Sequence, residues 1–256
     1  MKLFKIILLL CITNHTIGQN PLVSIITSVF KGDQFIQGFM EDIVQQTIFE
    51  HCELIIINAN SPGNEEPIIK EYMKLFPNIR YIKLDHDPGL YAVWNIGIKE
   101  AQAEFVTNAN LDDRLAFDCH EVLAKALLEH PEIDLVYSDF YETIYPNETF
   151  AKNRHRRRSN LAEYSWPALK KSCLPNSHPM WRKSIHEKYG YFDETFIAGG
   201  DWEMWCRAGK HGSLFLKIPG VYGLYYLNPK GLSTKDYRLV TREYKIMVAR
   251  HFNAKN

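Results

Sequence analysis

The sequence predicts an α/β fold: a mainly parallel, Rossmann-like sheet flanked by helices, with a smaller second lobe. The first reason is the length of 256 residues, which suits one large domain or two small ones. The second is a composition of 46% hydrophobic and 23% charged residues, the balance of a packed globular protein. The third is that strand-like and helical patterns alternate five times in roughly the first 140 residues, the rhythm of right-handed βαβ units.

The first half of the chain is divided by its hydrophobic runs. Leu22–Phe30 is rich in β-branched residues and is typical of a buried parallel strand, after which Asp33 is placed to cap a helix. Asp118 and Glu121 have the spacing of a capping pair at the start of a later helix. The remaining elements predicted here are strands at Glu53–Ile57, Arg80–Leu84, Glu104–Thr107 and Ile133–Tyr137, and helices at Glu65–Phe76, Leu90–Ala101 and Asp118–Glu129.

The pattern becomes less regular after Asp139. No internal repeat or low-complexity linker interrupts it, so we expect one continuous domain over residues 21–252, with one half at 21–138 and the other at 139–252. The elements predicted in the second half are short strands at Asp139–Ile144, near Asn176–Arg182, at Leu214–Ile218 and at Tyr222–Tyr226, and helices at Lys183–Tyr189, Asp201–Arg207 and Thr234–His251.

Charge and cysteine content exclude several classes of protein. Lys and Arg together number 30, as do Asp and Glu, so no global basic field is present to hold a nucleic-acid backbone. The five cysteines stand far apart without a C-x-x-C pair. This spacing argues against a zinc ribbon, a thioredoxin-type site and a disulfide-dense scaffold.

Residues 1–20 resemble a secretory signal peptide. Two lysines precede the uncharged run Ile6–Ile12, and a polar stretch ending in Gly18 follows it. The run is far shorter than the ~20 residues that span a bilayer. If the segment is cleaved, the protein is secretory or lumenal; if it is not, the protein is cytoplasmic or membrane-associated. The sequence leaves both open.

Loops after the predicted strands are the candidates for chemistry. Ligands of parallel sheets bind beyond the carboxyl ends of the strands, so loops 28–33, 58–64, 85–89 and 108–114 should line one cleft. Asn110, Asp112 and Asp113 offer oxygen ligands for a hard divalent cation, Mn²⁺ or Mg²⁺. The alternative is an Asx-rich turn that caps the next helix. No P-loop and no G-x-G-x-x-G motif follows the first strand.

Six segments in order give the chain a family resemblance. They are VSIITSVFKGDQFI, ELIIINANSPGN, DHDPGLYAVWNIGIKEA, AEFVTNANLDDRL, HPMWRKSIHEKYGYFDETF and AGGDWEMWCRAGKHG. Together they resemble a family 2 glycosyltransferase with the GT-A fold, from Leu22 to about Thr234. The likeness implies an inverting transfer of a sugar from a nucleotide donor, with Asp201 as general base. Gly200 stands where the family usually has Glu.

The resemblance also implies a cation site and a donor site. Asn110, Asp112 and Asp113 match a variant N-x-D-D motif in place of D-x-D, which would hold Mn²⁺ or Mg²⁺ on the donor diphosphate. An Asn at position 58 favours uridine without fixing it. The residues expected around the nucleoside are Thr27, Ser28, Asn58 and Asn60; those facing the donor are Asp87, Gly89, Tyr91 and Asn95; those on the acceptor side are His178, Trp181 and Glu203.

Several of these assignments have structural alternatives that the sequence leaves open. Asp201 is also suited to a helix N-cap, Tyr91 and Trp181 to the core, and the Asn-rich turn near Asn58 to bonding its own backbone. The basic run Arg154–Arg158 suits an anionic acceptor, a lipid phosphate or peripheral membrane contact, or else a solvated mobile loop.

Two functions remain in view. The first is a glycosyltransferase acting on a saccharide, lipid or protein hydroxyl. The second is a degenerate relative that binds nucleotide sugar or glycan without turnover, suggested by the neutral residues Asn58, Asn110 and Gly200 at positions where the family usually carries acids.

Overall fold

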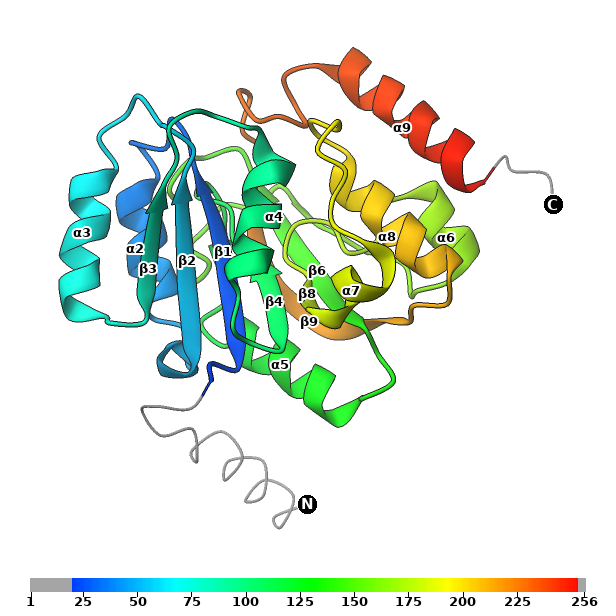
Figure 1. Ribbon diagram of the computed structural model, residues 1–256, viewed down its shortest axis with the longest axis horizontal. Coiled ribbons are helices and arrows are strands. Elements are labelled where there is room, and N and C mark those ends of the chain that lie inside the picture. The colour runs from blue at the N-terminus through cyan, green and yellow to red at the C-terminus, as the bar shows by residue number, and fades with distance from the viewer. Residues whose placement is uncertain (1–19, 253–256) are drawn as a thin grey trace, which may run out of the picture.

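In the computed structural model, which describes residues 20–252, helices cover both faces of a single mixed sheet (Figure 1). The strands are β1 (Val23–Val29), β2 (Cys52–Asn58), β3 (Ile79–Lys83), β4 (Phe105–Asn108), β5 (Arg114–Leu115), β6 (Leu135–Thr143), β7 (Arg157–Arg158), β8 (Met180–Arg182) and β9 (Phe215–Tyr226). The helices are α2 (Ile36–Ile43), α3 (Glu66–Leu75), α4 (Leu90–Glu100), α5 (Cys119–Glu129), α6 (Trp166–Lys171), α7 (Ser184–Tyr189), α8 (Gly200–Lys210) and α9 (Tyr237–His251), with a 3₁₀ turn, η1, at Phe49–His51.

The sheet order is β3-β2-β1-β4-β8-β6-β9-β5, with β7 paired to the outer end of β6. Strands β3, β2, β1 and β4 run parallel, and β6 and β9 are parallel to each other. Strand β8 is antiparallel to both β4 and β6 and joins the two parallel groups. The predicted α/β class with a mainly parallel sheet is therefore confirmed, and the antiparallel β8 lies between β4 and β6.

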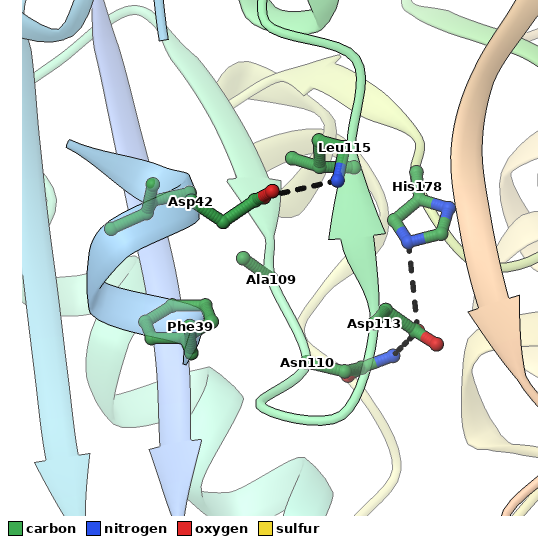
Figure 2. Close-up of a pocket in the computed structure, with 8 residues that line it drawn as sticks. Phe39, Asp42, Ala109, Asn110, Asp113, Leu115 and His178 are labelled. Atoms are coloured by element: carbon green, nitrogen blue, oxygen red, sulfur yellow. Dashed lines mark hydrogen bonds and ion pairs between the residues drawn. The ribbon is translucent and has the colours of Figure 1, made fainter. Parts of the chain in front are cut away.

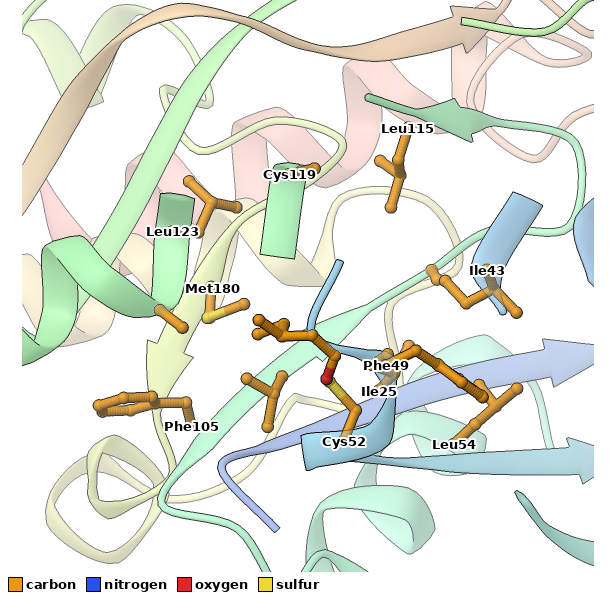
Figure 3. Close-up of a cluster of buried hydrophobic side chains, with 14 of the residues drawn as sticks. Ile25, Ile43, Phe49, Cys52, Leu54, Phe105, Leu115, Cys119, Leu123 and Met180 are labelled. Carbon is orange, nitrogen blue, oxygen red and sulfur yellow. The ribbon is translucent and has the colours of Figure 1, made fainter. Parts of the chain in front are cut away.

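The central strands are apolar throughout because both faces of the sheet are covered. Ile25 of β1 packs into the cluster under α2, α3 and α5, whereas its neighbour Ile26 packs into the cluster under α4, α7 and α8. Leu54 and Ile55 of β2 divide between the two clusters in the same way. Figure 3 shows part of the first cluster. The two cores fix β1 and β2, and hence the loops that follow them.

Two long strands replace four predicted short ones. β6 runs unbroken through the stretches predicted as Ile133–Tyr137 and Asp139–Ile144. β9 likewise joins two predicted strands across Pro219–Gly220, a pair that normally marks a turn. Pairing skips these two residues, since Ser138 lies opposite Ile218 and Asp139 opposite Val221, so the pair forms a bulge within the strand.

Both predicted helix caps are wrong. Helix α2 begins without a side-chain cap from any residue of the described chain, and the Asp33 carboxylate instead accepts the Asn64 backbone N–H. Asp118 precedes α5 but makes no capping bond to any described residue. Asp33 thus ties the loop after β1 to the loop after β2.

The short elements β5, β7, α6 and η1 were absent from the sequence prediction. None of the helices within residues 20–252 is long and apolar enough to cross a bilayer. Residues 1–19 of the predicted signal-like segment lie outside the described part of the chain.

Candidate active site

Loops at the carboxyl ends of β1, β2 and β4 meet at one edge of the sheet. The backbone N–H of Lys31 donates to Ser61 Oγ at 2.8 Å, and that of Gly32 donates to Glu65 Oε1 at 2.6 Å. A Cβ at Gly32 would lie 2.3 Å from Leu111 Cδ1, so the loop after β1 also touches the loop after β4. Of the four loops predicted to line one cleft (28–33, 58–64, 85–89 and 108–114), the first, second and fourth are joined by these contacts.

The loop after β4 presents the two predicted carboxylates, Asp112 and Asp113. Asp112 Oδ2 accepts from Asn228 Nδ2 at 2.8 Å. Asp113 Oδ1 accepts the Tyr226 N–H at 2.9 Å, and its Oδ2 accepts from Asn110 Nδ2 at 3.0 Å. Burial, followed by the charge of Asp113, raises the pKa of Asp112 to about 6. We call residues 110–113 the cation loop.

The donor atoms of the cation loop fit a cation shared with phosphate better than a cation held by protein alone. No group of three or more His, Cys, Asp and Glu side chains within residues 20–252 is arranged to hold a metal ion. Both oxygens of Asp113 already accept hydrogen bonds, whereas one oxygen of the half-buried Asp112 has no such bond to any described residue. Hard cations such as Mg²⁺ commonly take one or two carboxylates together with substrate phosphates.

His178 lies directly behind the cation loop (Figure 2). Its side chain is 7% exposed, its Nδ1 lies 2.7 Å from Ser177 Oγ, and its Nε2 lies 3.5 Å from Asp113 Oδ2. The sequence placed His178 where the acceptor or the donor sugar would sit, with an internally satisfied histidine as the alternative. The structure instead buries it against Asp113, because β8 follows immediately and carries the segment into the sheet.

Asp201 lies in the first turn of α8, where three groups surround its carboxylate. Oδ1 accepts from Tyr91 Oη at 3.3 Å and from the Trp202 N–H at 2.8 Å. Cys173 Sγ lies 3.9 Å from Oδ2. Burial raises the pKa of Asp201 to about 6, although these hydrogen bonds act in the opposite direction. Gly199, not Asp201, occupies the N-cap position of the helix.

Gly200 is required by Tyr91. A Cβ at position 200 would lie 2.7 Å from Cε2 of the Tyr91 ring. The ring itself is buried by Trp94 and Phe192, with centroids 5.4 and 5.8 Å away. The absence of a side chain at Gly200 therefore lets a core tyrosine present its hydroxyl to Asp201.

Glu243 of α9 fixes the loop that leads into α8, and sequence reasoning missed it. Its carboxylate is 3% exposed and accepts three consecutive backbone N–H groups. These come from Ile197 at 2.6 Å, Ala198 at 3.0 Å and Gly199 at 2.8 Å. An acidic residue inside an otherwise basic, amphipathic helix was the available signal.

The pKa of Tyr225 in β9 is affected by the charges of both Asp113 and Asp201, and sequence reasoning missed this residue as well. Burial, then the charge of Asp113, and more weakly those of Asp112 and Asp201, raise the pKa of Tyr225 to about 12. Its hydroxyl is thus within electrostatic reach of both the cation loop and Asp201. The tyrosine-rich end of β9 has the pattern of an ordinary strand, so the sequence does not mark Tyr225 as a site residue.

The predicted nucleoside residues differ in their freedom to bind a ligand. Asn58 Nδ2 donates to Tyr81 Oη at 2.9 Å, and its Oδ1 accepts the Ser61 N–H at 2.7 Å, which is the self-bonded turn that the sequence left as an alternative. Thr27 Oγ1 is buried without a hydrogen-bond partner among the described residues. Ser28 is half-buried, and Asn60 is exposed with a φ of 53°.

Two of the residues predicted to face the donor lie in the loop before α4, and a third, Asn95, lies within α4. Asp87 and Gly89 are exposed, and Asp87 Oδ1 accepts the Gly89 N–H at 2.9 Å. Asn95 is 2% exposed: its Nδ2 donates to Phe192 O at 2.9 Å, and its Oδ1 accepts the Phe192 N–H at 3.0 Å. The donor assignment of Asn95 is therefore wrong, since it anchors another chain segment.

Two acceptor-side assignments are also wrong. Trp181 is 1% exposed, and its Nε1 donates to His186 Nε2 at 2.9 Å, so its ring is core. Glu203 is 3% exposed and points toward α9. It accepts from Arg207 Nη2 at 3.0 Å, and its Oε1 lies 2.9 Å from His251 Nε2. Pattern alone does not show which side of a helix or strand a residue occupies.

The basic run Arg154–Arg158 is an anchored edge segment that includes β7 and pairs with β6. Its side chains are exposed, as predicted for a solvated segment, whereas the strand pairing of Arg157–Arg158 was not predicted. The ion pairs are Arg154 with Glu148, Arg157 with Glu142 and Arg158 with Asp139.

Comparison with known proteins decides the family. The profile described as glycosyl transferase family 2 matches residues 24–190, more than half of the chain. The chain belongs to glycosyl transferase family 2. The matched region contains the cation loop and ends before Asp201. The predicted family is thereby confirmed.

Curated relatives of this family 2 member are bacterial and archaeal. GgaB of Bacillus subtilis, a minor teichoic acid biosynthesis protein, is 30% identical over 115 residues, 44% of this chain and 13% of that protein. MJ1057 of Methanocaldococcus jannaschii, an uncharacterized glycosyltransferase, is 24% identical over 188 residues, 73% of this chain and 64% of that protein. The chain thus spans less than two thirds of the length of both.

Solved structures confirm the GT-A fold. S. aureus TarS 1-349 in complex with UDP-GlcNAc matches with a TM-score of 0.72 at 14% identity, over 90% of this chain and 67% of that one. The mannosyltransferase PcManGT from Pyrobaculum calidifontis, in complex with GDP-Man and Mn²⁺, matches with a TM-score of 0.61 at 13% identity, over 91% of this chain and 62% of that one.

Proposed function

We propose that this chain is an inverting, cation-assisted glycosyltransferase with Asp201 as general base. It moves a sugar from a UDP-linked donor to a hydroxyl group of a glycan, lipid-linked or protein acceptor. The observation that carries the proposal is the Asp201 carboxylate at the start of α8, held by Tyr91 and Trp202 and with a pKa of about 6. A base with this pKa is ionised at neutral pH and still takes up a proton readily.

In the proposed reaction, the acceptor oxygen attacks the anomeric carbon while the bond from that carbon to the donor diphosphate breaks. The proton of the acceptor hydroxyl passes to Asp201. Attack on the face opposite the leaving group inverts the anomeric centre. The hydrogen bonds from Tyr91 and the Trp202 N–H hold Oδ1, which leaves Oδ2, beside Cys173, to take up the proton.

Asn110, Asp112 and Asp113, the N-x-D-D variant, are proposed to hold Mn²⁺ or Mg²⁺ with the donor diphosphate. A divalent cation there would neutralise the charge that the departing nucleoside diphosphate gains. Oδ1 of Asp112 is the oxygen without a hydrogen bond to a described residue. Burial and the nearby charge of Asp113 disfavour the ionised form of Asp112 unless a positive charge is close by. Two adjacent carboxylates therefore suit a bound cation.

The proposed identities of the donor nucleotide and the acceptor are based on the similarity of this chain to other glycosyltransferases. TarS has been solved with UDP and with UDP-GlcNAc, and GgaB bears the name of a teichoic acid biosynthesis protein. These support a UDP-sugar donor and a glycan acceptor. A binder without turnover is the alternative, and one of its reasons is weakened, because Gly200 is needed for Tyr91 to reach Asp201.

The test is turnover of a panel of UDP-sugars with Mn²⁺, comparing the wild type with Asp201→Asn. We expect donor consumption to fall by at least about 100-fold in the variant, in line with the loss of a general base. Glu187→Gln is the matched control, because Glu187 is also acidic in the first turn of a helix but is exposed. Equal turnover in wild type and Asp201→Asn would refute the base, and no nucleotide binding at all would refute the donor site.

A further inference from the structure

A small pocket lies behind the cation loop, between α2 and the segment that leads into β8 (Figure 2). Its polar lining consists of Asp42, Asn110, Asp113 and His178. His178 Nε2 is buried and makes no hydrogen bond to any residue described, although it points at Asp113 Oδ2 from 3.5 Å. A buried polar atom without a partner is costly, which indicates a function for this arrangement.

The neighbours of His178 determine which ring nitrogen carries hydrogen. An ionised carboxylate can only accept hydrogen bonds, so the nitrogen facing Asp113 is favoured as N–H. Nδ1 then accepts, and the Ser177 hydroxyl 2.7 Å away is able to donate to it. The Asp113 carboxylate therefore favours the tautomer with Nε2–H, and the Ser177 hydroxyl is compatible with it because it can donate to Nδ1.

The position of the His178 ring is fixed from the opposite side by β9. A Cβ at Gly223 would lie 2.4 Å from His178 Nδ1, so only a glycine allows the strand this close to the ring. Gly223 itself pairs with Phe140 of β6 and Leu115 of β5. The imidazole is held between the sheet and the cation loop and cannot turn outward without displacing β9.

We propose that His178 is a positioning residue for the cation loop: its Nε2–H orients Asp113 and thereby sets where the loop presents oxygen to a divalent cation on a nucleoside diphosphate. This inference rests on the proposed function and assigns His178 to the cation rather than to the acceptor. Asp113 accepts hydrogen bonds from the Tyr226 N–H and from Asn110, and His178 Nε2 approaches its Oδ2 to 3.5 Å as the third neighbour. Partners that orient a metal-binding side chain typically change metal affinity by about 10–100-fold when removed.

Two amide substitutions separate this role from simple packing. In His178→Gln the side-chain amide nitrogen can occupy the place of Nε2 and still donate to Asp113. In His178→Asn the shorter amide reaches only the place of Nδ1, so contact with Ser177 is kept and contact with Asp113 is lost. Both variants retain a polar side chain of similar size, so each serves as the other's folding control.

The measurement is thermal stabilisation by UDP across a titration of Mn²⁺, without any acceptor. For wild type we expect stabilisation by UDP that Mn²⁺ increases. For His178→Asn we expect the half-effective Mn²⁺ concentration to rise about 10–100-fold, with stabilisation by UDP alone retained. His178→Gln should stay within about threefold of wild type. Metal-free melting temperatures of the two variants should agree.

The outcomes discriminate between the inference and the function on which it rests. Unchanged Mn²⁺ dependence in His178→Asn, with wild type responding normally, would overturn the role of His178 alone. Equal loss in both amide variants would reduce His178 to a packing residue and also overturn it. A wild type that binds UDP indifferently to Mn²⁺ would instead remove the cation from the proposed function.

Discussion

Tyr91 and Asp201, 110 positions apart, are joined by a hydrogen bond of 3.3 Å from the Tyr91 hydroxyl to Asp201 Oδ1. Tyr91 belongs to α4, which packs on β1 and β2, and Asp201 belongs to α8 in the other half of the chain. The bond therefore connects the nucleotide-side helix to the proposed base.

Removing this hydroxyl with Tyr91→Phe should shift the acid limb of the pH–rate profile upward. Tyr91 donates to the carboxylate and lowers its pKa against the larger effect of burial, so its loss raises the pKa above about 6. We expect a shift of about 0.5–1 pH unit, equivalent to about 0.7–1.4 kcal/mol. The measurement is kcat against pH from 5 to 9 at saturating donor. A limb that stays in place would show that Tyr91 has no influence on the group that titrates.

Much of the parallel half of the fold could be predicted from sequence. β1 and β2 lie within one or two residues of their predicted bounds, because an uninterrupted β-branched run between turn residues has few other interpretations. β9 was divided because Pro219–Gly220 forms a bulge where a turn is the usual outcome. β5 and β7 have two residues each, too short for any periodicity to reveal.

The site was predictable in its loops but not in its side-chain directions. The sequence placed residues 110–113 after a strand and Asp201 at the start of a helix, as the structure has them, since short motifs mark both segments. It assigned Asn95 and Trp181 wrongly. Asn95 bonds to the backbone of Phe192, which is far away in sequence, and Trp181 bonds to His186, which no sequence pattern singles out. Glu243 could be assigned only once α9 was seen to pack beside α8 (Figure 1).

Restoring a side chain at Gly200 should lower activity, although the family usually carries Glu there. A Cβ would lie 2.7 Å from the Tyr91 ring, and that ring is confined by Trp94 and Phe192. Gly200→Ala should cost about 1–3 kcal/mol of stability through overpacking and should reduce kcat by moving Asp201. Urea unfolding and initial rates measure the two effects.

Gly199→Ala is the matched control for Gly200→Ala. A Cβ at Gly199 meets its nearest neighbour, Glu243 Oε2, at 3.5 Å, an ordinary contact. The control should lose well under half of the stability lost by Gly200→Ala. Comparable losses in both variants would point to backbone requirements in this loop and away from the Tyr91 contact.

Glu243→Gln should destabilise the protein and impair catalysis together. Gln keeps one carbonyl oxygen, but its amide nitrogen would face a backbone N–H that the second carboxylate oxygen now accepts. Hydrogen bonds to a charged group contribute about 1.5–3 kcal/mol each, so we expect a loss of about 2–4 kcal/mol in the free energy of unfolding. The exposed Arg242→Gln, one residue earlier on the same helix, should change stability by less than about 0.5 kcal/mol. A Glu243→Gln protein as stable as Arg242→Gln would contradict the clamp.

Asp201→Asn should raise stability at alkaline pH while it abolishes turnover. The folded-state pKa of about 6 lies above the usual aspartate value of 3.8, so the native state binds more protons than the unfolded chain between these values. Stability of the wild type therefore falls as pH rises from about 4 to about 6, and the deficit persists above that range.

Asn at position 201 has no such ionisation, yet its side-chain oxygen can still accept hydrogen bonds from Tyr91 and the Trp202 N–H. We expect the variant to be about 1–2 kcal/mol more stable at pH 8 and equal to wild type near pH 4. Urea unfolding of both proteins at the two pH values measures this difference. If the difference in stability between the variant and the wild type were the same at pH 8 as at pH 4, ionisation of Asp201 would cost the folded protein nothing. Asp201 would then lack the buried environment from which its role as base is inferred.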